Sequence, residues 1–421
     1  MGMVKVDKVR FRINAFRTDE EIEFTFPSGW DITECRMAGH DKPALSDDEM
    51  RSALQNTIGT PRLREMAKGA KKVCILFDDI PKPTPTSRII PFVLEELHSG
   101  GVTDDQIRFL CAPGTHRPLI YPEMVAKLGR DVVEKYPIYN HSIWENLVDM
   151  GKTSRGTPVH INREFASCDL RLAVGSILPH SGAGFGGGAK IILPGISGIE
   201  TIAYHHNNLR INSELGRVED NTFRLDIEEA ARLAGLHFKV DTILNNRREV
   251  IGLFAGDFVA EHRVAVKLAA QVYRTETVKD VDVVVANSYP DEVQLIRTMW
   301  TISASLRQGG DAVIWSYAPD GQTLHQLNDR FGTDFGGRQF KPGRILKPQE
   351  KAARLIFVAP YLSKYERDAV CLPEKFVHCR DWGEALAELV GKNGPGTKVG
   401  VYPYVPLQMS EKAAQWVLGA K

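Results

Sequence analysis

Cysteine is scarce in this chain, and neither sign of charge is in excess. The 421 residues include six cysteines, and no two of them have the spacing of a zinc ribbon or a dithiol redox site. Scattered cysteines predict reduced thiols in a cytoplasmic protein. Lys plus Arg and Asp plus Glu number 53 each, so the net charge is zero, which excludes a broadly basic surface for nucleic acid or an anionic membrane. The cysteines are Cys35, Cys74, Cys111, Cys168, Cys371 and Cys379.

Long apolar segments are also missing. Charges in the first ten residues occupy the place where a signal peptide needs its apolar stretch, so we expect no export signal. The longest segment without charge, 172–189, contains six glycines together with Pro179 and His180. This composition disfavours a membrane-spanning helix, and it predicts a loop that approaches another group closely.

Short apolar runs alternate with amphipathic patterns along the chain. The apolar runs predict buried strands at 73–77, 107–111, 170–174, 281–285, 312–315 and 355–358. The amphipathic patterns predict helices at 89–98, 223–233, 260–273 and 295–306. This alternation is typical of an α/β protein with mainly parallel sheets, which is the predicted fold class.

A polar stretch at 274–277 separates the helix predicted at 260–273 from the next strand. We place a domain boundary there, between an N-terminal α/β domain at 1–273 and a C-terminal α/β domain at 278–395. The remaining segment, 396–421, ends in a helical pattern that could pack back on the first domain.

Polar residues follow two of the predicted strands, at the sheet edge where α/β proteins bind ligands. Asp78, Asp79 and Lys82 follow the strand at 73–77 in a proline-stiffened loop, and His116 follows the strand at 107–111. A histidine in this position can act as a general base near neutral pH. A structural interpretation stays open for both loops: the first could turn the chain and cap a helix, and His116 could be an ordinary surface or core histidine.

The segment with the most candidate functional residues follows the strand predicted at 170–174. It contains His180, a glycine-rich loop at 182–188 and Lys190. It is not a P-loop, because Lys190 lacks the preceding glycine and the following Ser or Thr. Three glycines have the dinucleotide-binding spacing, but no helix start and no acidic residue about 20 positions onward follow them. The glycines would let backbone amides approach a bulky or anionic group, with Lys190 as a cation or a nucleophile.

Two adjacent histidines, His205 and His206, lie a short way downstream. Neighbouring side chains on a helix or strand cannot both face one site, so at most one is expected to bind a metal. A zinc site made by protein alone needs three or four ligands, and no compact motif supplies them. A metal held mostly by a cofactor, with one histidine, fits the sequence better.

Taken in order, these motifs resemble the nickel-pincer lactate racemase family. They are Asp78-Asp79-x-x-Lys82-Pro83-Thr84-Pro85, Gly114-Thr115-His116-Arg117-Pro118, and the run from His180 through the glycines, Lys190 and Pro194-Gly195 to His206. The resemblance is sharpest between residues 78 and 206 and continues weakly at 289–297. The joint order is specific, although each motif alone is not.

The resemblance implies a cofactor, the nickel-pincer nucleotide, in which a pyridinium mononucleotide binds nickel through thioamide and thiocarboxylate arms. Lys190 matches the lysine that joins it covalently to the protein. His206 matches the single protein ligand to nickel, and a planar site of two sulfurs, one carbon and one imidazole nitrogen suits Ni(II). The glycines expected at the cofactor are Gly184, Gly186, Gly187 and Gly188. The resemblance also implies two α/β domains with the active site in the cleft between them.

The implied reaction is the racemisation or epimerisation of a 2-hydroxy acid. Hydride would pass reversibly from carbon two of the substrate to the cofactor, through a planar 2-keto acid. Each enantiomer presents its hydroxyl on a different side, and His116 and His180 match the family's two acid/base residues. Cofactor-making enzymes are implied as partners, and neither nucleic acid nor membrane is expected.

The substrate-binding positions depart from the lactate pattern. Asp79 and Gln294 are retained, but Lys82 stands where arginine is expected and Arg297 where lysine is expected. The planar guanidinium, which can bind a carboxylate through two hydrogen bonds, is therefore at position 297, and the ammonium group is at position 82, the reverse of the lactate pattern. A longer or more polar 2-hydroxy acid, including a sugar acid epimerised at carbon two, is at least as well supported as lactate.

Two other functions stay open from the sequence. An NAD-dependent 2-hydroxyacid dehydrogenase would use Gly182, Gly184 and Gly187 and would form NADH stoichiometrically. A non-catalytic carrier of the nickel-pincer or another nucleotide would need no pair of proton acceptors, so the presence of both His116 and His180 argues against it.

Overall fold

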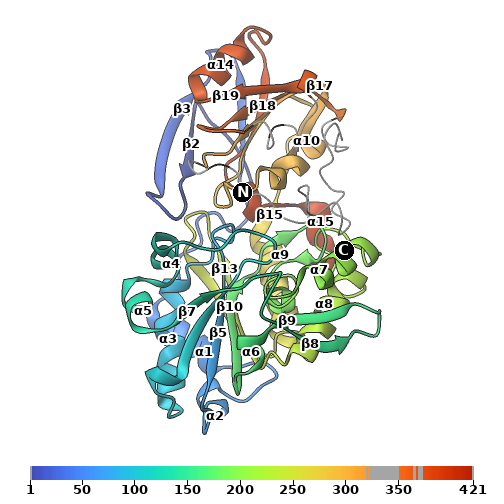
Figure 1. Cartoon of the computed structure of the whole chain (residues 1–421). Coiled ribbons are helices and arrows are strands. Elements are labelled where there is room, and N and C mark those ends of the chain that lie inside the picture. The colour runs from blue at the N-terminus through green and yellow to red at the C-terminus, as the bar shows by residue number, and fades with distance from the viewer. Residues whose placement is uncertain (1, 319–320, 322–349, 364–366, 368–372, 420–421) are drawn as a thin grey trace. The chain divides into compact units, whose positions relative to one another are not determined.

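The computed structural model describes residues 2–318, 321, 350–363, 367 and 373–419 (Figure 1). The chain forms two compact units, which we name by their sheets. The seven-stranded unit comprises the described parts of Met1–His40, Tyr273–Leu324 and Arg338–Lys412, and the six-stranded unit comprises Asp41–Val272 and the described part of Ala413–Lys421. Both main sheets are mostly parallel, which confirms the predicted fold class.

The sheet of the six-stranded unit has the order β14-β13-β10-β5-β6-β7. All neighbours are parallel except β13 and β14. The strands are β5 (Val73–Asp78), β6 (Ile107–Ala112), β7 (Ile138–Asn140), β10 (Leu170–Ser176), β13 (Phe238–Leu244) and β14 (Val250–Gly256). The strands predicted at 73–77, 107–111 and 170–174 are therefore confirmed, and β5 lies between the other two.

Helices cover both faces of this sheet. They are α1 (Asp47–Gln55), α2 (Leu63–Met66), α3 (Thr86–Ser99), α4 (Tyr121–Leu128), α5 (Arg130–Lys135), α6 (Arg163–Ala166), α7 (Ile199–Asn208), α8 (Thr222–Ala234) and α9 (Ala260–Tyr273). Two short sheets pair β8 (Leu147–Lys152) with β9 (Pro158–Asn162) and β11 (Pro179–His180) with β12 (Gly184–Phe185).

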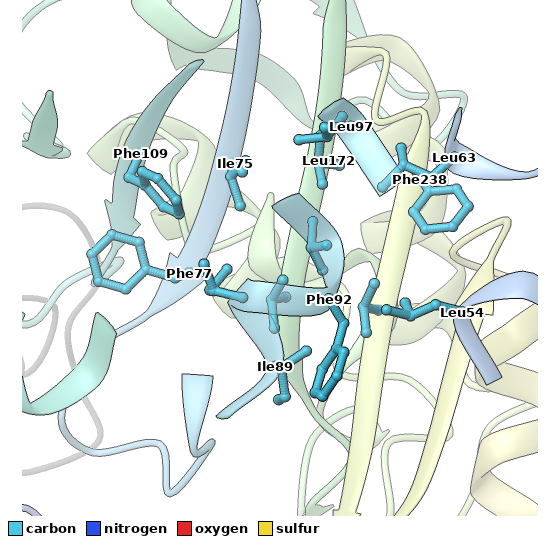
Figure 2. Packing of buried hydrophobic residues seen from close by; sticks show 14 of the residues in the cluster. Leu54, Leu63, Ile75, Phe77, Ile89, Phe92, Leu97, Phe109, Leu172 and Phe238 are labelled. Atoms are coloured by element: carbon cyan, nitrogen blue, oxygen red, sulfur yellow. The ribbon is translucent and has the colours of Figure 1, made fainter. Parts of the chain in front are cut away.

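Residues of β5 point alternately to two hydrophobic cores because successive strand side chains face opposite ways. Val73, Ile75 and Phe77 pack in a core with α1 and α3, and Cys74 and Leu76 pack in a core with α7 and α8. Figure 2 shows the first core, in which side chains of the sheet meet those of the helices. Burial on both faces explains why this strand is a continuous apolar run.

The seven-stranded unit has the sheet order β1-β4-β20-β16-β17-β18-β19, with only β1 antiparallel to its neighbour. Its strands are β1 (Met3–Lys5), β4 (Asp31–Cys35), β16 (Val281–Asn287), β17 (Leu306–Trp315), β18 (Ala352–Val358), β19 (Phe376–Cys379) and β20 (Lys398–Tyr402). It also contains the hairpin of β2 (Lys8–Ile13) and β3 (Glu20–Thr25), α10 (Met299–Ser305), α14 (Trp382–Val390), and the pair β15 (Arg274–Thr275) and β21 (Met409–Ser410).

The N-terminal residues are grouped differently from the expected domain at 1–273. Residues up to His40 belong to the seven-stranded unit, because β4 pairs with β20 from near the other end of the sequence. β4 mixes polar and apolar residues and shows no apolar run, so the sequence pattern gave no sign of it. The C-terminal helix α15 (Glu411–Leu418) falls partly in the six-stranded unit, where the Arg217 guanidinium lies 4.6 Å from the Trp416 ring centre.

The described cysteines are free and buried, and Cys371 lies outside the described residues. Across the part of the chain that the structure describes, every helix is too short or too polar to span a membrane.

A buried histidine makes the stability of the fold sensitive to acid. His141 donates from Nε2 to the Ser197 carbonyl (3.0 Å), and burial lowers its pKa from 6.5 to about 4. As pH falls, the unfolded chain binds a proton at His141 near pH 6.5, whereas the folded chain binds one only near pH 4. The contribution of His141 to the free energy of unfolding is therefore complete above about pH 6.5 and is lost as pH falls toward 4.

We expect His141→Gln, which keeps a donor for Ser197 but does not titrate, to remove up to roughly 3 kcal/mol of the stability loss between pH 7 and 4. Urea unfolding of both proteins across this range measures the difference. Equal slopes of unfolding free energy against pH would show that His141 contributes nothing.

Candidate active site

Three candidate residues of the six-stranded unit follow three neighbouring strands at one edge of its sheet. Asp79 follows β5, His116 lies four residues after β6, and His180 lies four residues after β10. Because β10, β5 and β6 are parallel neighbours, their carboxyl ends meet at the same edge. This is the edge at which open α/β sheets bind ligands.

Asp79 orients His116. The Nδ1 of His116 lies 2.7 Å from Oδ2 of Asp79, and both side chains are largely buried. Burial would raise the pKa of Asp79, but His116, Lys82 and Lys127 outweigh it, so the net shift is downward. An ionised carboxylate only accepts hydrogen bonds, so Nδ1 of His116 carries the proton and Nε2 carries the lone pair. His116 is thereby prepared to accept a proton through Nε2, with Asp79 to stabilise the resulting cation.

His180 is held in the opposite tautomer. Its Nδ1 accepts hydrogen bonds from the backbone amides of Gly182 and Ala183, each at 3.0 Å. The neutral ring therefore carries its proton on Nε2. His116 therefore presents a lone pair at Nε2, and His180 presents an N–H group at Nε2.

A buried ion pair between Lys127 and Asp78 supports the loop that follows β5. Lys127 of α4 is fully buried, and its Nζ donates to Asp78 (2.5 Å) and to the Lys82 carbonyl (2.9 Å). Thr84 bonds to Asp78 and, at 2.7 Å, to Ser176 at the end of β10. The pair therefore fixes the backbone that presents Asp79 and Lys82. Sequence reasoning missed Lys127, because a lysine in a short amphipathic helix usually faces solvent.

Removing Lys127 should destabilise the fold strongly. Lys127→Met would leave Asp78 buried without its cation, at a cost of roughly 3–5 kcal/mol. The matched control is Lys135→Met, since Lys135 forms an exposed ion pair with Asp104 worth about 1 kcal/mol or less. Urea unfolding of the two variants measures the difference, and equal losses would contradict this account of the buried pair.

The glycine-rich loop leads from β11 and β12 into the 3-10 helix Gly188–Ile191, which contains Lys190. The Lys190 amide donates to the Gly187 carbonyl at 3.2 Å. The Gly188 amide points inward and donates to Asp241 at 2.5 Å. The backbone around Lys190 is therefore tied to the interior of the unit.

Two glycines of this loop should respond very differently to alanine. Gly184 has φ of 73°, and a Cβ there would lie 2.0 Å from the Arg217 carbonyl oxygen. Gly186 has an ordinary backbone, and the nearest atom to its added Cβ is the Leu178 oxygen at 3.6 Å. We expect Gly184→Ala to cost about 2–6 kcal/mol, the sum of backbone strain and overpacking. Gly186→Ala should change stability by about 1 kcal/mol or less.

Thermal and urea unfolding of the two alanine variants test this difference. If both variants unfold like the unsubstituted protein, the close approach of Gly184 to Arg217 does not exist in solution.

His206 has the tautomer that a metal ligand needs. In α7 its Nδ1 donates to the Ile202 carbonyl (2.9 Å), which places the lone pair of the neutral ring on Nε2. The adjacent His205 instead donates from Nε2 to the Phe223 carbonyl (2.9 Å). Burial lowers the pKa of His205 to about 3, and the charges of Lys190 and Arg210 add to this effect.

These residues fit a cofactor that brings most of its own metal donors. Within the described ranges, no group of three or more His, Cys, Asp or Glu side chains could hold a metal ion. His206 can supply one nitrogen and Lys190 one amine, which is the set that the sequence resemblance implies for such a cofactor.

Gln294 and Arg297 belong to the seven-stranded unit. Arg297 lies in the 3-10 helix Leu295–Thr298, and its Nε lies 2.7 Å from a carboxylate oxygen of buried Asp291 and 3.2 Å from Oε1 of Gln294. Asp291 thus directs the guanidinium, a role that sequence reasoning missed although Asp291 stands in the 289–297 motif.

Comparison with known proteins identifies the family. Residues 18–216 match the family described as lactate racemase N-terminal domain. The chain is 33% identical over 288 residues to the lactate racemase of Lactiplantibacillus plantarum, covering 66% of this chain and 68% of the relative. It is 30% identical over 295 residues to the lactate racemase of Thermoanaerobacterium thermosaccharolyticum, covering 68% and 69%. The chain belongs to the lactate racemase family.

Solved structures support the fold of this lactate racemase family member. The lactate racemase apoprotein from Thermoanaerobacterium thermosaccharolyticum superposes with a TM-score of 0.69, at 24% identity, covering 96% of this chain and 99% of that chain. A protein from Thermotoga maritima superposes with a TM-score of 0.65, at 18% identity, covering 88% and 99%. The resemblance seen in the sequence motifs is therefore confirmed at the level of the family, and both curated relatives are named lactate racemases.

Proposed function

We propose that this chain racemises or epimerises a 2-hydroxy acid by reversible hydride transfer at carbon two. Membership of the lactate racemase family supports the reaction class. The observation that carries the mechanism is the pair of histidines at one sheet edge in complementary tautomers, His116 with Asp79 and His180 with two backbone amides.

We further propose a nickel-pincer nucleotide as the cofactor, held covalently by Lys190 and through its metal by His206. When bound, it would supply the hydride acceptor that no amino-acid side chain can provide. The tautomer of His206 and the anchored backbone of Lys190 support this assignment.

The two histidines would manage the hydroxyl proton. His116 takes the proton of one enantiomer through Nε2, and the buried Asp79 carboxylate stabilises the imidazolium. His180 presents its Nε2–H to the oxygen of the opposite enantiomer as a hydrogen-bond donor. To give and take the hydroxyl proton through Nε2, its ring releases the Gly182 and Ala183 amides and carries a proton on Nδ1, so that it cycles between imidazolium and neutral imidazole. In the reverse direction the two residues exchange these roles.

The substrate carboxylate would be bound by local cations. The backbone of Lys82 is fixed by the Lys127 bond to its carbonyl, and the Arg297 guanidinium is held by Asp291. Because Asp291 occupies the Nε side of the guanidinium, Arg297 can offer its two terminal nitrogens to a carboxylate. The exchange of a point charge and a planar group relative to the lactate pattern supports a longer or more polar 2-hydroxy acid.

A panel of single-enantiomer 2-hydroxy acids tests this function. The chain is co-expressed with cofactor-making enzymes, and each acid is followed by chiral chromatography and by NADH absorbance with added NAD. We expect inversion at carbon two with no net NADH. Stoichiometric NADH would indicate a dehydrogenase instead, and nickel-dependent loading without turnover of any acid would indicate a carrier.

Partnership with cofactor-making enzymes, a cytoplasmic location and an active site at the junction of two domains stay predictions.

A further inference from the structure

Three fully buried side chains hold the backbone of the glycine-rich loop just before Lys190. Each comes from a different element and bonds to a successive residue of the loop. His262 of α9 donates from Nε2 to the Gly186 carbonyl (2.9 Å), Arg224 of α8 donates to the Gly187 carbonyl (3.2 Å), and Asp241 of β13 accepts from the Gly188 amide (2.5 Å). We call these three side chains the loop clamp.

The charges of the loop clamp are balanced inside the protein. Arg224 pairs with Glu228 at 3.0 Å, and Asp241 pairs with the buried Lys239 at 2.5 Å. Glu261 is also buried; burial raises its pKa well above the usual value, and the charge of Asp241 adds to this shift. Buried ion pairs are seldom more stable than well-packed apolar residues. Their presence here is better explained by the geometry that they impose on the loop.

The loop clamp also explains two of the glycines. A Cβ on Gly187 would lie 2.9 Å from Asp241, and a Cβ on Gly188 would lie 2.8 Å from Arg224. Both residues have positive φ. Side chains at these positions would push the clamp away from the backbone, so these glycines are needed for contact with the protein itself, in addition to any approach to a cofactor.

We propose that His262, Arg224 and Asp241 are positioning residues that fix the Gly186–Gly188 backbone and thereby direct the Lys190 amine to the place where it is modified. The modification itself rests on the proposed function. The 3-10 helix starts at Gly188, and the Lys190 amide bonds to the Gly187 carbonyl. A change in the clamp therefore reaches Lys190 through two peptide units.

His262 offers the cleanest test because it is uncharged. Its pKa is lowered well below the usual value, first by burial and then by the charges of Arg224 and Arg263. His262→Leu removes the donor to Gly186, whereas His262→Gln keeps an N–H group near the position of Nε2. Arg224→Lys, which keeps the buried charge but loses the planar fork, is the second variant in case His262→Leu does not fold.

Two readouts are measured on the folded chains. The first is the fraction of Lys190 that carries the adduct, by peptide mass spectrometry after co-expression with cofactor-making enzymes. The second needs no cofactor: it is the rate at which acetic anhydride modifies Lys190 in the apoprotein, relative to the exposed Lys152. Unfolding is monitored in parallel, so that a general loss of stability is recognised.

For His262→Leu and Arg224→Lys we expect about a tenfold change in the fraction of Lys190 that carries the adduct and in its relative acetylation rate. Losing the hydrogen bonds that support other functional groups has effects of this size. His262→Gln should restore both. Unchanged Lys190 acetylation in folded His262→Leu and Arg224→Lys, or failure of His262→Gln to restore it, overturns the proposal. Absence of the adduct in the unsubstituted chain would overturn the proposed function instead, and the acetylation readout would still decide on the clamp.

Discussion

Lys190→Ala is expected to abolish both the covalent adduct and the racemisation of 2-hydroxy acids. The side chain supplies the only amine that we place at the cofactor, and it lies in a 3-10 helix whose backbone is tied to the interior of the unit. Without the amine no covalent bond to the cofactor can form. Intact-mass spectrometry after co-expression with cofactor-making enzymes shows the adduct, and chiral chromatography of the same preparation shows the activity.

Lys190→Arg is the matched control for this variant. It keeps the positive charge near His205 but offers no amine for attachment. We expect Lys190→Arg to be as inactive as Lys190→Ala. An active Lys190→Arg protein would mean that the position contributes only charge, and the covalent role would have to be given up.

His116→Ala and His180→Ala are each expected to lower racemisation by about 10²–10⁴-fold, the usual contribution of a positioned acid/base group. The adduct at Lys190 should form normally in both variants, since neither histidine is placed at the attachment point. His98→Ala is the matched control, because His98 is a partly exposed histidine at the end of α3 paired with Asp104. It should keep full activity.

The two variants should also differ in which enantiomer they oxidise. Each histidine serves the enantiomer whose hydroxyl faces it, so each variant should still convert the other enantiomer to the bound 2-keto acid. Acid quenching after a single turnover should release keto acid from one enantiomer with His116→Ala and from the mirror-image substrate with His180→Ala. The same preference in both variants would contradict two acid/base groups on opposite faces, and loss of the adduct would make the histidines structural.

The strands of this fold were readable from the sequence where they are buried on both faces. β5, β6 and β10 appear as apolar runs for that reason. β13 does not, because Lys239 and Asp241 alternate with apolar residues and suggest a strand with one face in water. In the folded chain every residue of β13 is buried, since the two charges pair with each other and Asp241 also binds the glycine loop.

Only part of the candidate site could be predicted from the sequence, because some of its residues stand in motifs and others do not. Residues such as His116, Lys190 and His206 stand in ordered motifs that follow predicted strands. The side chains that orient them come from elsewhere: Lys127 lies in a helix that resembles a surface helix, and Arg224 lies on α8, more than 30 residues after Lys190. These partners are defined by the sheet order and helix packing, which a single sequence does not contain.

The fate of hydrogen at carbon two tests the central claim most directly. One enantiomer of an accepted 2-hydroxy acid, deuterated at carbon two, is incubated with loaded enzyme in ordinary water, and the inverted product is analysed by chiral chromatography and mass spectrometry. Reversible hydride transfer predicts that the inverted product keeps its deuterium, while His116 and His180 exchange only the hydroxyl proton. Inverted product that has lost its deuterium to water would contradict the account.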